Sequence, residues 1–134
     1  MIADQKLDLA GMTMQTRQLV PMVSVKDVER SVGFYGRLGF EVGNTFVPEG
    51  ATKTAWAWLR CGEAQLMLAQ ASEAIVADQQ KVLFYLYTDD VDAAHASLAE
   101  EGLSPGDISK PFYAPRGEFQ VVDPDGYVLM ITHT

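Results

Sequence analysis

The chain has 134 residues, the usual size of one domain with a core of its own. Its 10 Lys and Arg residues stand against 18 Asp and Glu residues, and a net charge of −8 repels nucleic-acid phosphates and anionic lipid surfaces. The 48% hydrophobic and 21% charged content is typical of a water-soluble globular protein, and no apolar run approaches the roughly 20 residues of a membrane span. We therefore expect neither nucleic acid nor a membrane as a partner.

We expect residues 1–16 to form an N-terminal segment and residues 17–134 to form a single domain. The segment lacks the basic start and the apolar block of an export signal. Cys61 is the only cysteine, so no internal disulfide can form, and a reducing cytoplasm is the expected location. The expected role of Cys61 is that of a half-exposed turn residue. The sequence leaves open whether the N-terminal segment is ordered or is exchanged between two subunits.

Two stretches of the chain repeat one pattern 63 residues apart. Asp27 and Asp90 each supply a side-chain oxygen for the free N–H groups of a helix start. Apolar residues then recur at helical spacing, and Gly39 and Gly102 each end the pattern as a left-handed cap would. The sequence therefore predicts one helix in each half of the chain.

Each predicted helix is preceded by one predicted strand and followed by three. In the first half these strands cover residues 19–25, 40–47, 54–59 and 64–69, and in the second half residues 82–88, 106–110, 118–122 and 127–132. A strong turn at Asp123-Pro124-Asp125-Gly126 separates the last two strands. The sequence thus predicts an α+β fold of two tandem βαβββ modules, about residues 17–79 and 80–134, that form a curved mixed sheet around a cleft.

Strand alternation indicates which side chains line this cleft. A four-residue turn at 123–126 pairs Phe119 with Met130, and the repeat then places Trp58 opposite Gln65 and Trp56 opposite Met67. The predicted cleft set is Val20, Met22, Ser24, Trp56, Trp58, Gln65, Met67, Leu83, Tyr85, Tyr87, Phe119, Val121, Val128 and Met130. Rings, thioethers and a few polar tips together are typical of a ligand-binding surface, although an ordinary core explains any single ring better. A slip of one residue would reverse the assignment.

Two motifs resemble the vicinal oxygen chelate superfamily, also called glyoxalase/bleomycin resistance/dioxygenase proteins. They are PMVSVKDVERSVGFY at residues 21–35 with Leu38-Gly39-Phe40, and RGEFQVVDPDG at residues 116–126. The resemblance spans residues 19–132 and implies a paired βαβββ fold in which enzymes hold a divalent metal with four inward His, Glu or Gln side chains. Those four positions fall on Val20, Met67, Leu83 and Met130.

Val and Leu side chains have no lone pair for a metal, so we expect no divalent metal site and no cofactor. Cu(I) bound by the thioethers of Met22, Met67 and Met130 is an alternative, but methionine commonly fills gaps. The only histidines are His95, on the stripe of the second helix, and His133, out of phase with Met130. Without a histidine, a suitable cysteine or a metal in the cleft, ordinary acid–base, nucleophilic and Lewis-acid catalysis lack their usual groups, and we expect no catalytic residue.

Four acidic residues lie near the predicted rim, where solvation is their expected role: Glu49, Glu63, Asp107 and Glu118. Glu118 and Arg116, beside the aromatic Phe112 and Tyr113, are candidates for orienting a ligand.

Metal-free members of the superfamily that look like this chain bind drugs without altering them, mostly as homodimers. The sequence is therefore interpreted as a metal-free binder of an aromatic or cationic small molecule. The candidate ligand-binding residues are Trp56, Trp58, Met67, Tyr85, Tyr87, Phe112, Tyr113, Arg116, Glu118, Phe119 and Met130. Two alternatives stay open: a metal-dependent lyase, isomerase or dioxygenase with other ligands, and an interaction module with a vestigial cleft.

Overall fold

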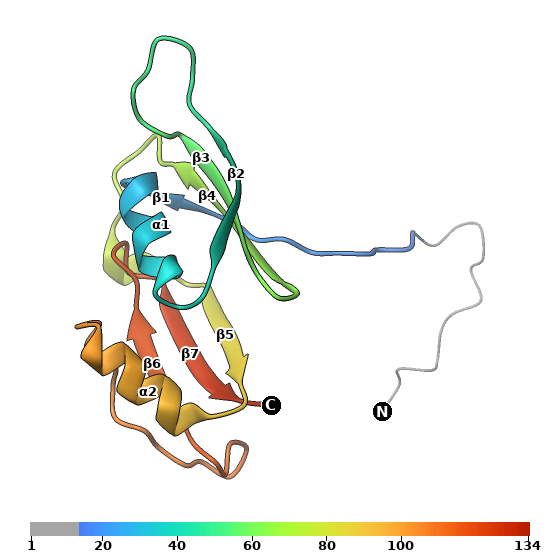
Figure 1. Ribbon diagram of the computed structural model, residues 1–134, viewed down its shortest axis with the longest axis vertical. Coiled ribbons are helices and arrows are strands. Elements are labelled where there is room, and N and C mark those ends of the chain that lie inside the picture. The colour runs from blue at the N-terminus through green and yellow to red at the C-terminus, as the bar shows by residue number, and fades with distance from the viewer. Residues whose placement is uncertain (1–13) are drawn as a thin grey trace.

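The computed structural model describes residues 14–134 as two modules, each a mixed sheet with one helix (Figure 1). Module 1 comprises β1 (Met22–Val25), α1 (Val28–Gly36), β2 (Glu41–Phe46), β3 (Trp56–Cys61) and β4 (Ala64–Gln70). Module 2 comprises β5 (Leu83–Thr88), α2 (Val91–Glu100), β6 (Glu118–Val122) and β7 (Val128–His133), and a short 3₁₀ helix, η1 (Ala77–Gln79), joins the two. The predicted α+β fold is confirmed. Most of the predicted N-terminal segment lies outside the described residues, and no helix in residues 14–134 is long and apolar enough to cross a membrane.

The strands form two separate sheets rather than one continuous curved sheet. Their orders are β1-β4-β3-β2 and β5-β7-β6, and in each the opening strand runs parallel to the closing strand of its module. The predicted strand at 106–110 is reduced to a bridge from Ser109 to Glu118 and one hydrogen bond of 2.9 Å from the Gly106 N–H to the Gln120 carbonyl. Pro105 and Pro111 flank this segment, and proline gives a strand no N–H to donate.

The predicted helix ends are confirmed in both modules. The Asp27 and Asp90 carboxylates each accept a hydrogen bond from the backbone N–H three residues later, at 3.2 and 3.0 Å. Gly39 and Gly102 follow the helices with φ of +96° and +80°, a conformation that favours glycine because it has no Cβ.

The register of module 1 keeps both tryptophans on the predicted face. Trp58 lies opposite Met67 and Trp56 opposite Ala69, so the predicted pairs are displaced by two residues. A displacement of two residues preserves the face of every side chain, since alternation has a period of two. The displacement arises because the β3–β4 turn leaves only Gly62 and Glu63 unpaired.

The register of module 2 contradicts the prediction for Phe119. Gln120, not Phe119, lies opposite Met130, because the turn between β6 and β7 has five unpaired residues instead of four. The Asp123 carboxylate holds this longer turn by accepting the N–H groups of Asp125 and Tyr127 at 2.8 and 2.9 Å. Phe119 and its neighbour Val121 therefore lie in the core.

The core of each module lies between its sheet and its helix. Phe119 is 2% exposed, and the edge of its ring contacts His95 of α2 at a centroid distance of 4.9 Å. Val25, Leu59, Leu68 and Leu129 are also fully buried. The predicted helix-side packing of α2, with His95 as a packed residue, matches this arrangement.

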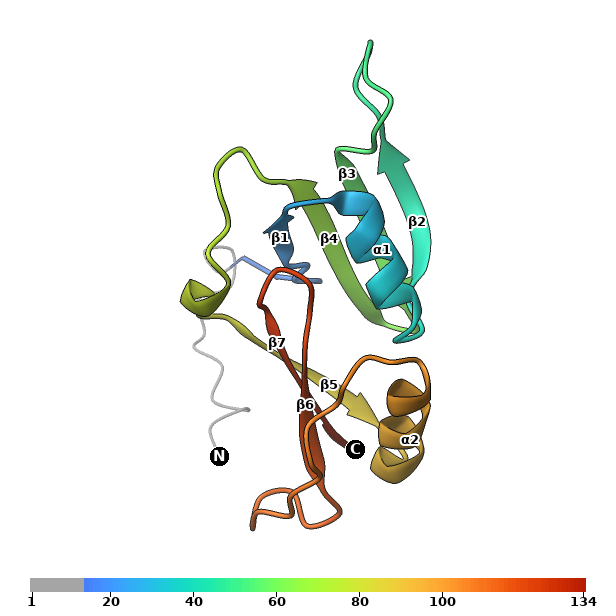
Figure 2. The ribbon, with the colours of Figure 1, turned by 90° about the vertical axis from the view of Figure 1, so that its left-hand side faces the viewer.

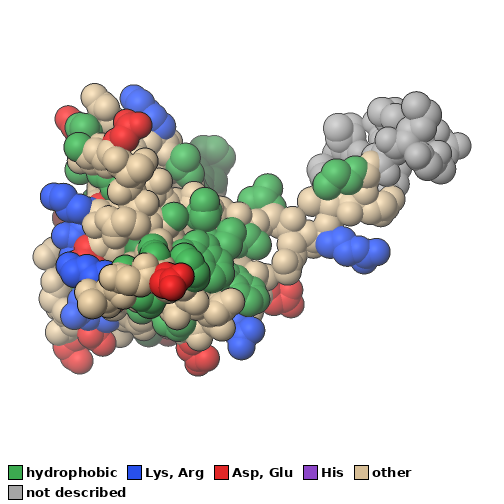
Figure 3. Space-filling view, turned by 90° about the horizontal axis from the view of Figure 1, so that it is seen from above, with side chains coloured by type: hydrophobic (Ala, Val, Ile, Leu, Met, Phe, Trp, Pro, Cys, Tyr) green, Lys and Arg blue, Asp and Glu red, His purple; other side chains and the backbone are tan. Residues whose placement is uncertain are grey.

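We call the face of each sheet opposite its helix the open face. Both helices lie on the same side of the molecule, and residues 14–21 leave from the opposite side (Figures 1 and 2). Large apolar side chains on the open faces are uncovered, with Met22 57% and Tyr87 65% exposed. Hydrophobic side chains gather on the side from which residues 14–21 leave (Figure 3). The chain alone thus leaves an extensive apolar surface in contact with water.

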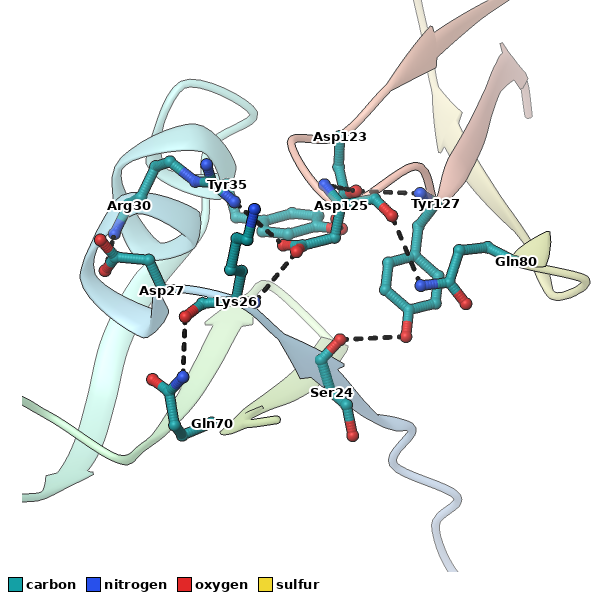
Figure 4. A network of polar contacts seen from close by, with 10 residues as sticks. All are labelled: Ser24, Lys26, Asp27, Arg30, Tyr35, Gln70, Gln80, Asp123, Asp125 and Tyr127. Carbon is teal, nitrogen blue, oxygen red and sulfur yellow. Dashed lines mark hydrogen bonds and ion pairs between the residues drawn. The ribbon is translucent and has the colours of Figure 1, made fainter. Parts of the chain in front are cut away.

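A network of buried carboxylates fixes one module against the other (Figure 4). Asp125 of the β6–β7 turn accepts the backbone N–H of Lys26 at 2.9 Å and lies 3.5 Å from the Arg30 guanidinium. The neighbouring Asp123 accepts the hydroxyl of Tyr35 on α1 at 2.8 Å. Both aspartates are almost fully buried. The turn of module 2 is therefore anchored at the start and along the inner face of the module 1 helix.

Burial sets the protonation behaviour of this network. Desolvation raises the pKa of Asp123, because it outweighs the hydrogen bonds from Tyr35, Tyr127 and Asp125 that favour the carboxylate. Burial, followed by the negative charge of Asp123, raises the pKa of Tyr35 above the titration range, so this hydroxyl stays protonated and donates.

The register of β6 predicts opposite results for two neighbouring alanine substitutions. Phe119→Ala should lower the free energy of unfolding by about 3–5 kcal/mol, because it empties a core site. Gln120→Ala should change it by no more than about 0.5 kcal/mol, because Gln120 is exposed on the open face. Urea unfolding followed by circular dichroism measures both, and equal small losses would return Phe119 to the open face.

The raised pKa of Asp123 predicts how Asp123→Asn behaves with pH. As pH falls, the folded protein protonates Asp123 before the unfolded chain does, so the stability contributed by this group increases until its ordinary pKa is reached. The variant lacks this gain. Its stability relative to the native chain should be most favourable at neutral pH and should decline toward about pH 4 in urea unfolding.

The exposed Asp107→Asn change removes the same charge and serves as the control. If the free energy of unfolding of Asp123→Asn rises relative to that of the native chain as the pH falls, the pKa of Asp123 is not raised in the folded protein.

Candidate functional site

The open face of module 1 carries both tryptophans of the chain. Cross-strand register places Met22, Met67 and Trp58 in one row across β1, β4 and β3. The next row holds Ser24, Ala69, Trp56 and, on β2, Phe46. Flat rings and flexible thioethers side by side make an adaptable surface for a planar ligand.

Polar groups on this face orient the Trp58 ring. Its indole N–H donates to the Gln65 side-chain oxygen at 3.0 Å, and the Arg60 guanidinium lies 5.9 Å from the ring centroid. The hydrogen bond satisfies the one polar group of a half-buried indole, and the guanidinium lies within cation–π range. The ring is thereby fixed with part of its surface accessible.

The open face of module 2 is built from three cross-strand rows. From β5 through β7 to β6 these are Leu83, Val128 and Val122; Tyr85, Met130 and Gln120; and Tyr87, Thr132 and Glu118. The rings of Tyr85 and Tyr87 lie 6.4 Å apart at a tilt of 32°. The predicted cleft residues Tyr85, Tyr87 and Met130 thus share one face with Glu118.

Glu118 and Tyr113 interact directly, whereas Arg116 has other contacts. The Tyr113 hydroxyl donates to Glu118 Oε2 at 2.8 Å, and this hydrogen bond is the main reason that the pKa of Tyr113 is raised. The Arg116 guanidinium contacts the ring of His133 and the carbonyl oxygen of Thr134. Phe112 is almost fully exposed and meets the Tyr113 ring edge-on at 5.5 Å. The structure therefore groups Phe112, Tyr113 and Glu118 and gives Arg116 a role at the end of β7.

A pocket of about 640 Å³ lies where the two modules meet. Its volume is within the range of small-molecule sites. It contains the predicted cleft residues Gln65, Leu83, Tyr85 and Tyr87, together with Cys61 and Glu63, whereas the tryptophans lie outside it. Its other lining residues are Leu19, Pro21, Tyr35, Leu38, Phe40, Ala64, Leu66, Phe84, Leu86 and Leu129.

The four positions that hold a metal in related enzymes do not fit one here. The registers of β1 with β4 and of β5 with β7 make Met22 equivalent to Tyr85 and Met67 equivalent to Met130, as the repeat predicted. Val20 and Leu83 lie two residues before the first of these pairs. Two hydrocarbon side chains and two thioethers provide no oxygen or imidazole ligand. Residues 14–134 also contain no group of three or more His, Cys, Asp or Glu side chains arranged to hold an ion.

Several contributors to the open faces were missed by the sequence patterns. Gln120 and Val122 replace Phe119 and Val121 there, a change that only the length of the β6–β7 turn could have revealed. Arg60 was missed because a charged residue at a strand end gives no apolar signal. We therefore leave Phe119 out of the candidate binding surface.

Solved structures with the same fold are numerous. A bleomycin resistance determinant encoded on the transposon Tn5 is 20% identical, with a TM-score of 0.71, and the match covers 89% of this chain and 98% of that one. A bleomycin-binding protein from bleomycin-producing Streptomyces verticillus, complexed with copper(II)-bleomycin, is 23% identical with a TM-score of 0.66 over 91% and 99% of the two chains. An antibiotic binding protein from Streptomyces sp. CB03234 is 21% identical with a TM-score of 0.66 over 90% and 98%.

No curated protein matches the chain significantly. At these identities the structural likeness shows a shared fold. The model of the Glyoxalase/Bleomycin resistance protein/Dioxygenase superfamily matches residues 17–131, nearly the whole of the described chain. With its paired βαβββ-like modules, the chain belongs to the glyoxalase/bleomycin resistance protein/dioxygenase superfamily.

Proposed function

We propose that this protein binds and sequesters an aromatic or cationic small molecule, with antibiotics as the first class to test, and that it does so without a metal. The observation that supports this most directly is the chemistry of the open faces. They carry Trp56, Trp58, Tyr85 and Tyr87, and the four positions Val20, Met67, Leu83 and Met130 offer no oxygen or imidazole ligand. The structural neighbours that bind bleomycin or another antibiotic support the same function class.

The aromatic surface is sufficient for useful affinity. Stacking and cation–π contacts contribute about 0.5–2 kcal/mol each. Several such contacts, with burial of apolar ligand surface, reach the roughly 8 kcal/mol of a micromolar complex after the cost of association. A ligand that needs only to be held, and not converted, requires no acid, base or metal.

We further propose that the functional form is a cytoplasmic homodimer in which a second copy covers part of the open faces. Exposed Met22, Leu83 and Tyr85 support this, because an uncovered apolar surface of this kind marks an interaction site. Sedimentation velocity of the full chain measures the state directly, and a monomer at micromolar concentration would contradict it.

A panel of antibiotics that includes bleomycin tests the binding function. A ligand present at 100 times its Kd should stabilise the protein by about 2.7 kcal/mol, which raises the Tm by several degrees in a thermal-shift measurement. The same ligand should quench the fluorescence of Trp56 and Trp58, and Trp58→Leu should weaken binding about tenfold or more through lost stacking.

N-acetyl-tryptophanamide at matched absorbance controls for trivial quenching by a coloured drug. Elemental analysis of the purified protein separates binding from catalysis. Stoichiometric zinc, nickel, manganese or iron would overturn the metal-free proposal and favour an enzyme. A metal-free protein that shows no thermal shift with any member of the panel would favour the interaction module over an antibiotic binder.

A further inference from the structure

Glu118 is the one residue on the open face of module 2 that combines a negative side chain with burial. It is 6% exposed, although it lies at the start of β6 in the same row as the exposed Tyr87. Its Oε2 accepts the Tyr113 hydroxyl, but its Oε1 is buried with no hydrogen-bond partner in the described structure. A buried acceptor without a partner is costly, and a buried carboxylate is normally paired with a cation.

No cation of the described chain fulfils that role. The ion pairs of residues 14–134 join Arg30 to Asp125 and Arg37 to Glu101. Arg116, two residues from Glu118, directs its guanidinium to His133 and Thr134 instead. The carboxylate is therefore left with one free oxygen in a protein whose net charge of −8 already attracts cations.

Three aromatic residues lie near this carboxylate. Tyr113, 59% exposed, covers Glu118 with its hydroxyl, and Phe112 beside it is 95% exposed. Tyr87 lies in the same cross-strand row as Glu118, with Thr132 between them. Exposed ring faces next to a carboxylate are the chemical surroundings in which organic ammonium, amidinium or guanidinium groups bind, through an ion pair and cation–π contacts together.

We propose that Glu118 is the anionic anchor of a subsite for an organic cation, with the aromatic pair Phe112 and Tyr113 as its cover. The cation donates to Oε1, and the Tyr113 side chain, which is held by a single hydrogen bond on an exposed loop, moves to admit it. This deepens the proposed function and rests on it, because it assigns a positive charge to the sequestered ligand and places that charge in module 2.

Matched probes test the charge directly. Naphthylmethylamine and naphthylmethanol share one ring system and differ in a single positive charge, and their affinities for the full chain can be measured by isothermal titration calorimetry at pH 7. We expect the amine to bind about tenfold or more tightly than the alcohol, the effect of a hydrogen bond between charged groups. Glu118→Gln should abolish this preference, because the amine loses its charged partner and binds no more tightly than the alcohol.

Glu100→Gln is the matched control, since it removes the same charge from the exposed end of α2 and should keep the preference. Tyr113→Phe provides a second variant that keeps the ring and frees Oε2, and it should keep or increase the preference for the amine. A Tyr113→Phe variant that loses the preference would assign the amine to the hydroxyl and overturn the proposal.

The remaining outcomes separate this inference from the proposed function. Equal binding of the two probes by the native chain would refute the subsite and leave the proposed function standing. Binding of neither probe, together with a negative antibiotic panel, would end both. Dissociation of a native dimer by Glu118→Gln with an unchanged amine preference would mean that a second copy supplies the cation, which also overturns the proposal.

Discussion

Each sheet of this protein has a single helix to cover it, and much of the other face is left exposed in the described chain. A sheet is stable in water when its apolar faces are buried, so three or four strands with one helix leave half of that requirement unmet. On the helix side the residues are aliphatic and closely packed, with Leu68 and Leu129 fully buried. On the open side, aromatic and thioether-bearing side chains such as Met22 and Tyr87 reach solvent. The same constraint that forms the core thus creates the surface on which the proposed function depends.

The two open faces differ in chemistry although the modules share one plan. In module 1 the central ring is an indole held by Gln65, with a guanidinium above it. In module 2 the equivalent position on the third strand is Gln120, and the polar group in the neighbouring row is the carboxylate of Glu118. The open face of module 1 thus combines an electron-rich ring with a positive side chain. The open face of module 2 combines tyrosines with a negative side chain. Such surfaces favour different parts of a ligand.

Local signals carried most of what could be predicted from the sequence. The helix starts at Asp27 and Asp90 were recognisable because a cap depends on residues within one turn of it. The placement of Trp56 and Trp58 survived an error of two residues, since an even shift preserves the face. The placement of Phe119 was wrong, because an error of one residue in the register moves a side chain to the other face of the sheet. The register of Phe119 depends on the length of the turn between β6 and β7, and strand periodicity contains no information on that length.

Long-range polar contacts were invisible for a different reason. Lys26 and Asp125 lie 99 positions apart, and neither belongs to a pattern that points to the other. The pairing of Tyr113 with Glu118 is closer in sequence, but it requires an irregular loop between Pro111 and Gly117 that no periodicity describes. The candidate site could therefore be predicted as a set of residue types on a face, but the hydrogen bond from Tyr113 to Glu118 could not.

The anchoring of Asp125 at the start of α1 makes the two halves of the chain unequal partners in folding. The first half is synthesised with the Lys26 amide and the Tyr35 hydroxyl lacking the acceptors that only the last dozen residues bring. A fragment that ends at η1 would thus expose two donors without acceptors, along with the apolar face of its sheet. The first module should therefore reach its final form only after the turn between β6 and β7 has left the ribosome. Separation of the halves into independent genes would require that turn to be supplied by another chain.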